Sequence, residues 1–516
     1  MEGNVMRWLK QAVAGCFLAV ALFGEEVILS PQDVLLAGVE TTLWGVLSSE
    51  RQYDRELSQL WENQDGYLPV LEEGEICTYV WEYECRDGVT LDDGWPQGLV
   101  RPLADSWHLF DNQCFHLVDG RREGTVTVRL RYWDDAGKEW VATRQMTIMT
   151  PPEWSSREGV DIRRRIGVIR GLHYLQRRQQ ADGFWWDGGD ECYRAATTGC
   201  ALWAFGNHGY GLANQKDNPF FSCVETAVRR LSWLVDIWPL NGQGRSHDSN
   251  RNGRAVRLGE GWENSNYVHP ICLCGMMAAG KADYDVELSG EIGQFGGMPP
   301  GSPIPCTLGE LVGDGIDYIL MQLSVSGKTS WAYNYMYGTD GYDLSIAGWN
   351  YLALLAGEGW GIDVDETSLL KFQMFLESVY HDDLQYFTYT PSKQSFHTES
   401  LDASGLMGLL LMSCRGMGDD NLQRLGGSGV GSALLDGTNQ LFDWVRRASG
   451  RSVGYSWWSV AKGFGLTGVN SKLIDGRLFD WRYGWADGTD GGWRKILECQ
   501  ESDGRWTIEE EAHSVD

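Results

Sequence analysis

Helix-like segments with almost no charge recur along the second part of the chain, and they constrain the fold more than any other feature. One of them, DLSIAGWNYLALLAGEGWGI, spans residues 343–362. Each segment opens with a short polar stretch that can cap a helix, continues with about ten apolar residues and closes at glycine. The segments begin at Thr197, His269, Asp343, Asp402 and Tyr455. A helix that is apolar on all sides is buried, so neighbouring helices must cover these segments.

Amphipathic segments precede the apolar ones and supply this cover. Three of them span residues 227–238, 311–323 and 368–380. The pairs recur at intervals of roughly 55 to 75 residues, as in a stacked helical array. An outer amphipathic helix paired with an inner apolar helix predicts an α/α toroid of about five to six helical hairpins over residues 155–516.

One turn motif occurs near both ends of this helical region with the same spacing. The two copies are Gln179, Gly183 and Trp185, and Gln500, Gly504 and Trp506. They resemble the QW motif of the terpene cyclase and prenyltransferase repeat family (prenyltransferase/squalene oxidase repeats), in which a glutamine at the end of an outer helix is tied to a tryptophan in the following turn. The resemblance implies a toroid in which these residues are architectural. No sixth inner helix follows the second copy, so the array is either open or truncated there.

The first part of the chain, residues 25–150, has a period of two. TVTVRLRYWDD (125–135) and EWVATRQMTIM (139–149) alternate in polarity and predict two strands joined as a hairpin. YVWEYECRDG (79–88) predicts another half-buried strand. The fold class is therefore multidomain, β plus α, with a small β-sandwich before the toroid.

These strands resemble an immunoglobulin-like β-sandwich of the polycystic-kidney-disease (PKD) type. The matching residues are Trp81, Asp87, Gly88, Gly124 and the stretch 134–137. Residues 51–73 look like an insertion. In secreted proteins such domains act mostly as spacers or adhesive modules, and the resemblance implies no chemistry here.

The first 24 residues are typical of a signal peptide. Arg7 and Lys10 precede an apolar run over residues 12–24 that is too short to span a bilayer, and Ala19-x-Ala21 offers a cleavage site. The sequence thus predicts export to the periplasm, the cell surface or the medium, with no transmembrane span in the mature chain. A buried N-terminal helix is the alternative.

Charge and cysteine content narrow the possible partners. The net charge of −28 argues against nucleic acid, whose phosphates such a chain repels. Loss of Cys16 on export would leave an odd number of the 12 cysteines, which excludes a complete set of disulfides. Cys77 and Cys85 are placed to pair across adjacent strands. Most other cysteines lie in apolar helical segments and fit small core residues.

The activities of the toroid family each need a motif that is missing here. The D-x-D-D acid of the cyclases is absent, and the nearest stretch, 363–366, lies in a loop before an outer helix. Asp343, Cys272 and His397 could supply the zinc ligands of a prenyltransferase, but no matching local motif surrounds them. The thioester motif GCxEQ is also absent. The resemblance therefore extends to the fold and not to the catalytic residues.

Five acidic residues near the starts of inner helices are nevertheless candidates for acid–base chemistry in the toroid cavity. They are Asp187, Asp190, Glu191, Asp343 and Asp402. Paired carboxylates can work on a sugar or a polyene if the pKa of one is raised. The alternative is that each acid caps a helix and offsets its dipole.

Aromatic and histidine side chains at the same ends are candidates for ligand binding. They are Trp186, His269, Trp349, His397, Trp457 and Trp458. Aromatic-walled clefts stack on apolar or glycan ligands. The histidines have no partner at a recognisable spacing, so roles in the core or on the surface are the alternative.

Residues 247–260, HDSNRNGRAVRLGE, match the first half of a calcium loop. Asp248, Asn250 and Asn252 stand at ligand positions, but Glu260 comes one place late for the bidentate ligand. Calcium is the one cofactor that the sequence suggests. An ordinary Asn/Gly turn between helices is the alternative.

Together these features predict an exported binding or structural protein, built on a terpene-cyclase-like toroid without a recognisable catalytic motif. Its ligand would be a small apolar molecule or a glycan, and no protein partner is indicated. The alternative is an enzyme that works in the toroid cavity, either a divergent terpene cyclase or a polysaccharide-active enzyme.

Overall fold

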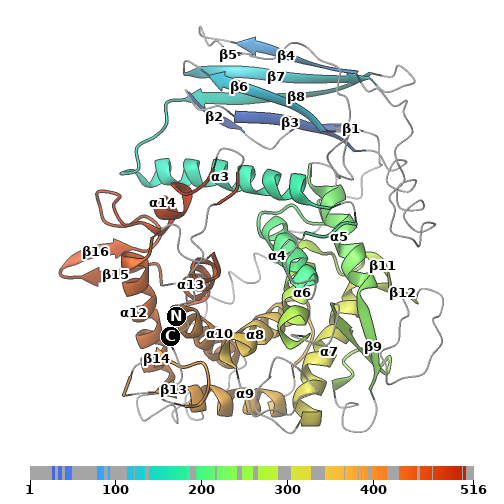
Figure 1. The fold of residues 1–516 in the computed structure, drawn as a ribbon, viewed down its shortest axis with the longest axis vertical. Coiled ribbons are helices and arrows are strands. Elements are labelled where there is room, and N and C mark those ends of the chain that lie inside the picture. Colours follow the sequence, from blue (N-terminus) through green and yellow to red (C-terminus); the bar gives the residue numbers. More distant parts are fainter. Residues whose placement is uncertain are drawn as a thin grey trace, which may run out of the picture. The chain divides into compact units, whose positions relative to one another are not determined.

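The computed structural model describes most of the chain from residue 139 onwards and separate strands before it. The described residues are 26–29, 33–37, 41–48, 78–85, 91–92, 113–120, 123–133, 139–180, 182–185, 193–214, 218–240, 247–259, 265–288, 304–326, 343–364, 366–381, 383–384, 386–392, 397–414, 429–449, 454–467, 469–501 and 504–506. The fold is mixed α/β, with small sheets and many helices (Figure 1).

The chain divides into two compact units. The first comprises Met1–Pro152, Leu175–Gly183 and His208–Thr226, and the second comprises Glu153–Tyr174, Phe184–Asn207 and Ala227–Asp516. The first unit thus includes two short segments of the helical region, residues 175–183 and 208–226. Each unit has its own core.

Two four-stranded sheets make up the β part of the first unit. One has the order β1 (Glu26–Leu29), β3 (Thr41–Ser48), β6 (Gln113–Gly120), β5 (Leu91–Asp92), and the other has the order β2 (Val34–Leu36), β8 (Glu139–Met149), β7 (Gly124–Trp133), β4 (Thr78–Cys85). Strand β1 contacts β7 and β8, so the sheets pack on each other. Val126, Val128 and Leu130 alternate along β7 and are all fully buried. The predicted hairpin of β7 and β8 is confirmed, while its turn lies outside the described residues.

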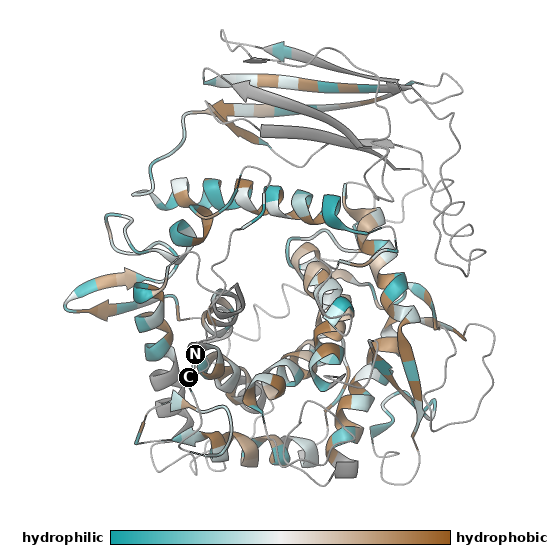
Figure 2. Cartoon of the chain, viewed as in Figure 1, coloured by the Kyte–Doolittle hydropathy of each residue, from teal (hydrophilic) through white to brown (hydrophobic). Residues whose placement is uncertain are grey.

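The second unit contains the apolar helices expected from the sequence. These inner helices are α4 (Arg194–Asn207), α6 (Ser265–Ala279), α8 (Leu344–Gly359), α10 (Glu399–Cys414) and α13 (Gly454–Thr467). Each contacts the next in the series, and they line the inside of a ring (Figure 1). Brown and white residues prevail on α6 and α8, as expected for buried helices (Figure 2).

Outer helices accompany the inner ones. They are α3 (Arg157–Arg178), α5 (Phe221–Trp233), α7 (Leu308–Ser326), α9 (Glu366–Val379), α12 (Gly429–Arg447) and the short α14 (Gly492–Leu497). Helices α3 and α5 each run from one unit into the other. The sequence had predicted α7 and α9 but had not singled out α12.

Glycines bring neighbouring inner helices into backbone contact. Gly199 of α4 lies against Cys272 of α6, and seven residues further on Gly206 lies against Ala278. The contacts advance in the same direction along both helices, so α4 and α6 are parallel. Helices α8 and α10 are also parallel, because Gly348 of α8 lies against Ser404 of α10, and Tyr351, further along α8, lies against Gly408. In each pair the N-terminal ends therefore lie on the same side.

In the first copy of the turn motif the glutamine side chain bonds to backbone oxygens, one of them in its own turn. The Gln179 amide nitrogen donates to the carbonyl oxygen of Gly183 at 2.9 Å and to that of Cys223 on α5 at 2.9 Å. Gly183 has a φ of 86°, a conformation that favours glycine. The glutamine amide thus closes its own turn and ties it to the next outer helix.

The second copy repeats this arrangement and contacts the first outer helix. The Gln500 amide nitrogen donates to Gly504 O at 3.0 Å and to Gly167 O on α3 at 2.8 Å. Gly504 has a φ of 94°, and the indole of Trp506 lies against Gly171 of α3. The last described turn is therefore fastened to the first outer helix.

Two local predictions were wrong. Residues 235–238 were assigned to an outer helix but lie in strand β9 (Val235–Pro239), which pairs with β10 (Arg254–Leu258). Val235 and Ile237 are buried and Asp236 is half-buried, so the true period there is two. The inner helix assigned to start at His269 starts at Ser265 and carries Pro270 inside it.

The carbonyl oxygen that Pro270 leaves without its helical donor belongs to Asn266, four residues earlier. The side-chain amide of Asn350 on α8 donates to this oxygen at 3.1 Å. The same amide also donates to Ile346 O in its own helix at 2.9 Å. A neighbouring inner helix therefore supplies the hydrogen bond that proline cannot.

Within the part of the chain that the structure describes, no helix combines the length and apolar character needed to cross a bilayer.

The contact between α4 and α6 predicts the effect of adding one methyl group. A Cβ atom at residue 206 would lie 2.2 Å from the backbone oxygen of Ala278. We expect Gly206→Ala to lower the free energy of unfolding by about 1–3 kcal/mol, because the helices must move apart. Urea denaturation followed by circular dichroism measures this change.

Gly465→Ala in α13 is the matched control, since nothing lies within 4 Å of its added Cβ. This variant should be neutral or more stable by up to about 1 kcal/mol, because alanine favours a helix over glycine. Equal effects of the two substitutions would contradict the assigned contact.

Candidate functional site

The N-terminal ends of α8 and α10 carry two of the predicted acids. Asp343 is buried and caps α8, with its Oδ1 accepting from the backbone N–H of Ser345 at 2.8 Å and of Ile346 at 3.3 Å. Its Oδ2 accepts a hydrogen bond from the hydroxyl of Tyr389. Burial raises the pKa of the Asp343 carboxyl, and the hydrogen bonds from Ser345 and Tyr389 oppose that rise. The capping role is the alternative that the sequence had left open.

Asp402, in the first turn of α10, is fully buried and makes different contacts. Its Oδ1 accepts from the backbone N–H of Phe387 at 3.0 Å, and its Oδ2 lies 2.7 Å from Nε2 of His397. The His397 ring stacks on Tyr386, with centroids 4.0 Å apart and planes 24° apart. The sequence interpretation of His397 as a histidine without a partner was wrong.

A single segment links the two acids. Strand β14 (Tyr386–Phe387) and the residues that follow it run past the starts of both helices. The backbone N–H of Leu344 donates to Tyr389 O at 3.0 Å, while Phe387 contacts Asp402 as described above. We call Asp343, Tyr386, Tyr389, His397 and Asp402 the acid–tyrosine cluster. The cluster contains a carboxylate–imidazole pair, which is an arrangement able to accept and return a proton.

Aromatic side chains form a second group on the inner helices. Tyr193, just before α4, meets Tyr267 of α6 with ring centroids 6.3 Å apart at 86°. Tyr267 meets Trp349 of α8 at 6.1 Å and 71°, and Trp349 meets Trp203 of α4 at 5.8 Å and 64°. Trp349 and Trp203 are buried, while Tyr193 is 36% exposed. We call these four residues the aromatic chain.

A lysine from α13 reaches the inner member of the aromatic chain. The Lys462 ammonium lies 4.3 Å from the centre of the Trp203 ring, a cation–π contact. Burial lowers the pKa of Lys462, and Cys274 partly offsets this effect. The residue as a whole is half-buried. Among the described residues no carboxylate pairs with it.

The other predicted binding residues have packing roles or lie outside the described chain. His269 is buried, with its Nδ1 accepting from Leu258 N at 2.9 Å and its Nε2 3.0 Å from Gly315 O. Burial lowers the pKa of His269 to about 3, so the ring is neutral and links β10 to α7. The Trp457 indole donates to Ser449 O at 3.1 Å. The side chain of Trp458 and the residues Trp186, Asp187, Asp190 and Glu191 lie outside the described part.

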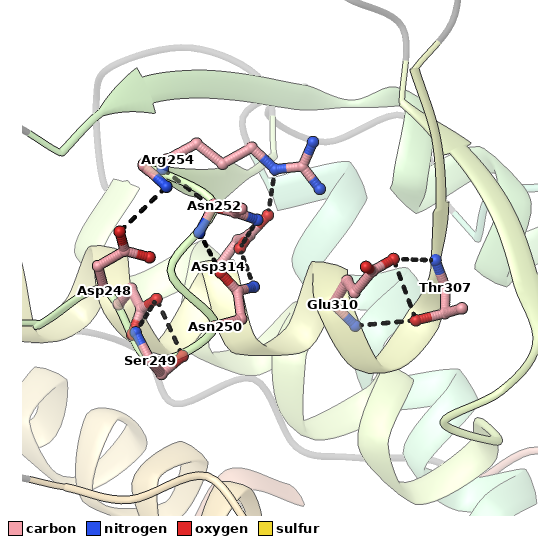
Figure 3. A network of polar contacts seen from close by, with 10 residues as sticks. Asp248, Ser249, Asn250, Asn252, Arg254, Thr307, Glu310 and Asp314 are labelled. Carbon is pink, nitrogen blue, oxygen red and sulfur yellow. Dashed lines mark hydrogen bonds and ion pairs between the residues drawn. The ribbon is translucent and has the colours of Figure 1, made fainter.

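The predicted calcium loop is held against α7 by a buried acid (Figure 3). The amide nitrogens of Asn250 and Asn252 donate to Oδ1 of Asp314 at 2.6 and 2.7 Å, and Arg254 pairs with its Oδ2. The Asn250 and Asn252 side-chain oxygens accept backbone N–H groups within the loop. Calcium would have to displace these contacts, so calcium binding stays a prediction. No group of three or more metal-binding side chains occurs within the described ranges.

A second acid on α7, one turn after Asp314, anchors the same loop. Oδ2 of Asp317 accepts from the backbone N–H and the hydroxyl of Ser249, both at 3.0 Å. Asp317 is fully buried, and the loss of hydration raises its pKa to about 8. The Asp314 carboxylate contributes to this rise. Burial thus favours the protonated form of Asp317, while Arg254 pairs with the Asp314 carboxylate.

The helix that carries both acids begins with a capping box. Thr307 and Glu310 exchange hydrogen bonds, with the Glu310 carboxylate accepting from Thr307 N at 2.8 Å and the Thr307 hydroxyl accepting from Glu310 N at 3.2 Å (Figure 3). Two otherwise unsatisfied N–H groups at the start of α7 are thereby paired. The capping box fixes where the helix begins and hence where its two acids face the loop.

Comparisons with known proteins find only distant likeness. No protein-family model and no curated protein matches the sequence. The structure is distantly similar to a polysaccharide lyase, with TM-score 0.33, 11% identity, and 94% of this chain and 60% of that chain covered. It is also distantly similar to a Salmonella α2-macroglobulin that had reacted with methylamine, with TM-score 0.27, 11% identity, and 91% and 27% covered. The chain spans less than two thirds of either protein, and likeness at these TM-scores supports no argument about function.

The raised pKa of Asp317 predicts how stability depends on pH. The folded pKa of about 8 exceeds the ordinary value, so this group stabilises the fold fully below about pH 4 and loses that contribution as pH rises through 8. Asp317→Asn keeps the shape and removes the titration. We expect the free energy of unfolding of the variant to fall less steeply between pH 5 and 9, by up to about 1.4 kcal/mol per pH unit. Urea denaturation at each pH tests this.

Asp283→Asn is the matched control, since that side chain is 72% exposed. Its profile should run parallel to that of the unchanged protein. A parallel profile for Asp317→Asn as well would show that Asp317 does not hold its proton in the folded state.

Proposed function

We propose that this protein is an exported glycan-binding protein, and that the aromatic chain on its inner helices is the binding surface. The observation that carries the proposal is the continuous contact from exposed Tyr193 through Tyr267 to buried Trp349. Aromatic rings stack on the apolar faces of sugars, and tyrosine hydroxyls supply hydrogen bonds at the edge. The net charge of −28 favours a neutral glycan over a polyanion.

The architecture that we propose for this function is the α/α toroid of the terpene cyclase and prenyltransferase type over residues 155–516. The parallel inner helices support it, as do the two turns in which a glutamine amide makes the same pair of hydrogen bonds. The two packed sheets support a PKD-like sandwich over residues 25–150. In such an arrangement the inner helices carry the ligand surface and the sandwich is a spacer.

Export is the cellular setting that we propose, with residues 1–24 as the signal peptide. We expect a bacterial host to secrete the full chain and to remove the segment that contains Arg7 and Lys10. Intact-mass measurement of the secreted protein gives the cleavage position. A product that keeps residue 1 and stays inside the cell contradicts the proposal.

Removing the exposed ring should weaken glycan binding without disturbing the core. Tyr193→Ala is expected to raise the dissociation constant roughly fivefold, corresponding to about 1 kcal/mol of lost stacking. Tyr193→Phe should keep most of the affinity, because the ring remains. Titration calorimetry with neutral oligosaccharides, chosen from a glycan array, measures both.

Tyr284→Ala is the control for a tyrosine outside the aromatic chain, where the hydroxyl accepts from Arg229 at 3.1 Å. Its affinity should equal that of the unchanged protein. The proposal fails if no neutral glycan binds, or if Tyr193→Ala and Tyr284→Ala bind equally well.

A further inference from the structure

We propose that His397 and Asp402 form a catalytic pair in which His397 is the general base for hydrolysis of an ester. This inference goes beyond glycan binding and does not depend on it. It differs from the enzyme alternatives that the sequence left open, a divergent terpene cyclase and a polysaccharide-active enzyme. The observations that carry it are the position of the imidazole between a buried carboxylate and a tyrosine ring, and the engagement of one of its nitrogens, with no partner for the other among the described residues.

The carboxylate fixes the orientation of the imidazole. Oδ2 of Asp402 lies 2.7 Å from Nε2 of His397, and the backbone N–H of Phe387 holds the other carboxylate oxygen at 3.0 Å. Asp402 is fully buried and cannot turn toward solvent. The neutral imidazole therefore carries its hydrogen on Nε2, directed at Asp402. The lone pair lies on Nδ1.

The other ring nitrogen is the one that a substrate could reach. In the described part of the chain, Nδ1 of His397 has no hydrogen-bond partner, and the side chain is 23% exposed. His269 shows the contrast, since both of its nitrogens are engaged and the residue is buried. Stacking on Tyr386 keeps the His397 ring plane fixed. A histidine that served packing alone would not need an open nitrogen.

The chemical step is a proton transfer coupled to acyl transfer. Nδ1 of His397 accepts a proton from water as the water oxygen bonds to the ester carbonyl carbon. The resulting imidazolium is stabilised by the Asp402 carboxylate, which stays ionised. When the bond to the alcohol oxygen breaks, the imidazolium returns its proton to that oxygen. Ester and water give acid and alcohol, and His397 ends neutral. Imidazole suits this role because it exchanges protons near neutral pH.

The first test uses a chemical probe that needs no substrate. Diethylpyrocarbonate acylates unprotonated imidazole nitrogen, and peptide mass spectrometry reports each of the nine histidines separately. We expect His397 to react at least tenfold faster than His269. In Asp402→Asn the rate of His397 labelling should change while that of His269 does not, because the His397 ring loses the carboxylate that orients it. Equal labelling of the two histidines, or His397 labelling unaffected by Asp402→Asn, overturns the pairing.

The second test measures the reaction with p-nitrophenyl acetate. We expect His397→Gln to lower the enzymatic rate about 100-fold, and Asp402→Asn to lower it with a shifted pH profile. His208→Gln, at an exposed histidine, should leave the rate unchanged. Hydrolysis by the unchanged protein no faster than by His397→Gln overturns the proposal. Glycan titration of the same variants distinguishes the hydrolysis proposal from the glycan-binding proposal. A variant that loses hydrolysis and still binds glycan leaves the glycan-binding proposal intact.

Discussion

The side-chain amides of Gln179 and Gln500 each donate two hydrogen bonds to backbone carbonyl oxygens, one within their own turn and one on an adjacent outer helix. Each amide thus joins two outer helices at a turn where the chain reverses. Glycines with positive φ complete both turns. The order of the outer helices depends on such turns, because most of the contact between apolar inner helices is non-directional packing. The second copy is the more consequential, since it fastens the last turn to α3.

With the outer helices fixed, glycines let the inner helices approach to backbone contact in parallel. Parallel packing places N-terminal ends together, and those ends need side-chain caps. Asp343 meets this need at α8, and its other oxygen accepts from the Tyr389 hydroxyl. Asp402, in the first turn of α10, instead accepts from the backbone N–H of Phe387 and contacts His397. The acid–tyrosine cluster thus combines a helix cap on α8 with a buried carboxylate of α10 that strand β14 holds. The cluster can take part in chemistry because each carboxylate has one oxygen that contacts a side chain rather than the backbone.

Much of the fold could be predicted from the sequence because its signals are local. The alternation along β7, the apolar inner helices and the spacing of Gln500 and Gly504 are all visible within about a dozen residues. The pairing of His397 with Asp402 was not predicted. A helix begins between these two residues, so their separation of five positions does not fix the distance between their side chains. The contacts of Asp314 with a loop sixty residues earlier depend on tertiary packing alone. The helix prediction for residues 235–238 was wrong because these residues pair with β10, a strand from another segment of the chain.

Pro270 has a consequence for how α6 and α8 are aligned. The Asn266 oxygen lies in an apolar layer and loses its helical donor to the proline ring, so a donor must come from outside α6. Asn350 supplies it from one position on α8. Sliding α8 by one turn along its axis would withdraw that amide and leave a buried acceptor unsatisfied. Proline is usually regarded as a helix breaker. Here Pro270 fixes the alignment of α6 and α8, which apolar packing alone would leave open.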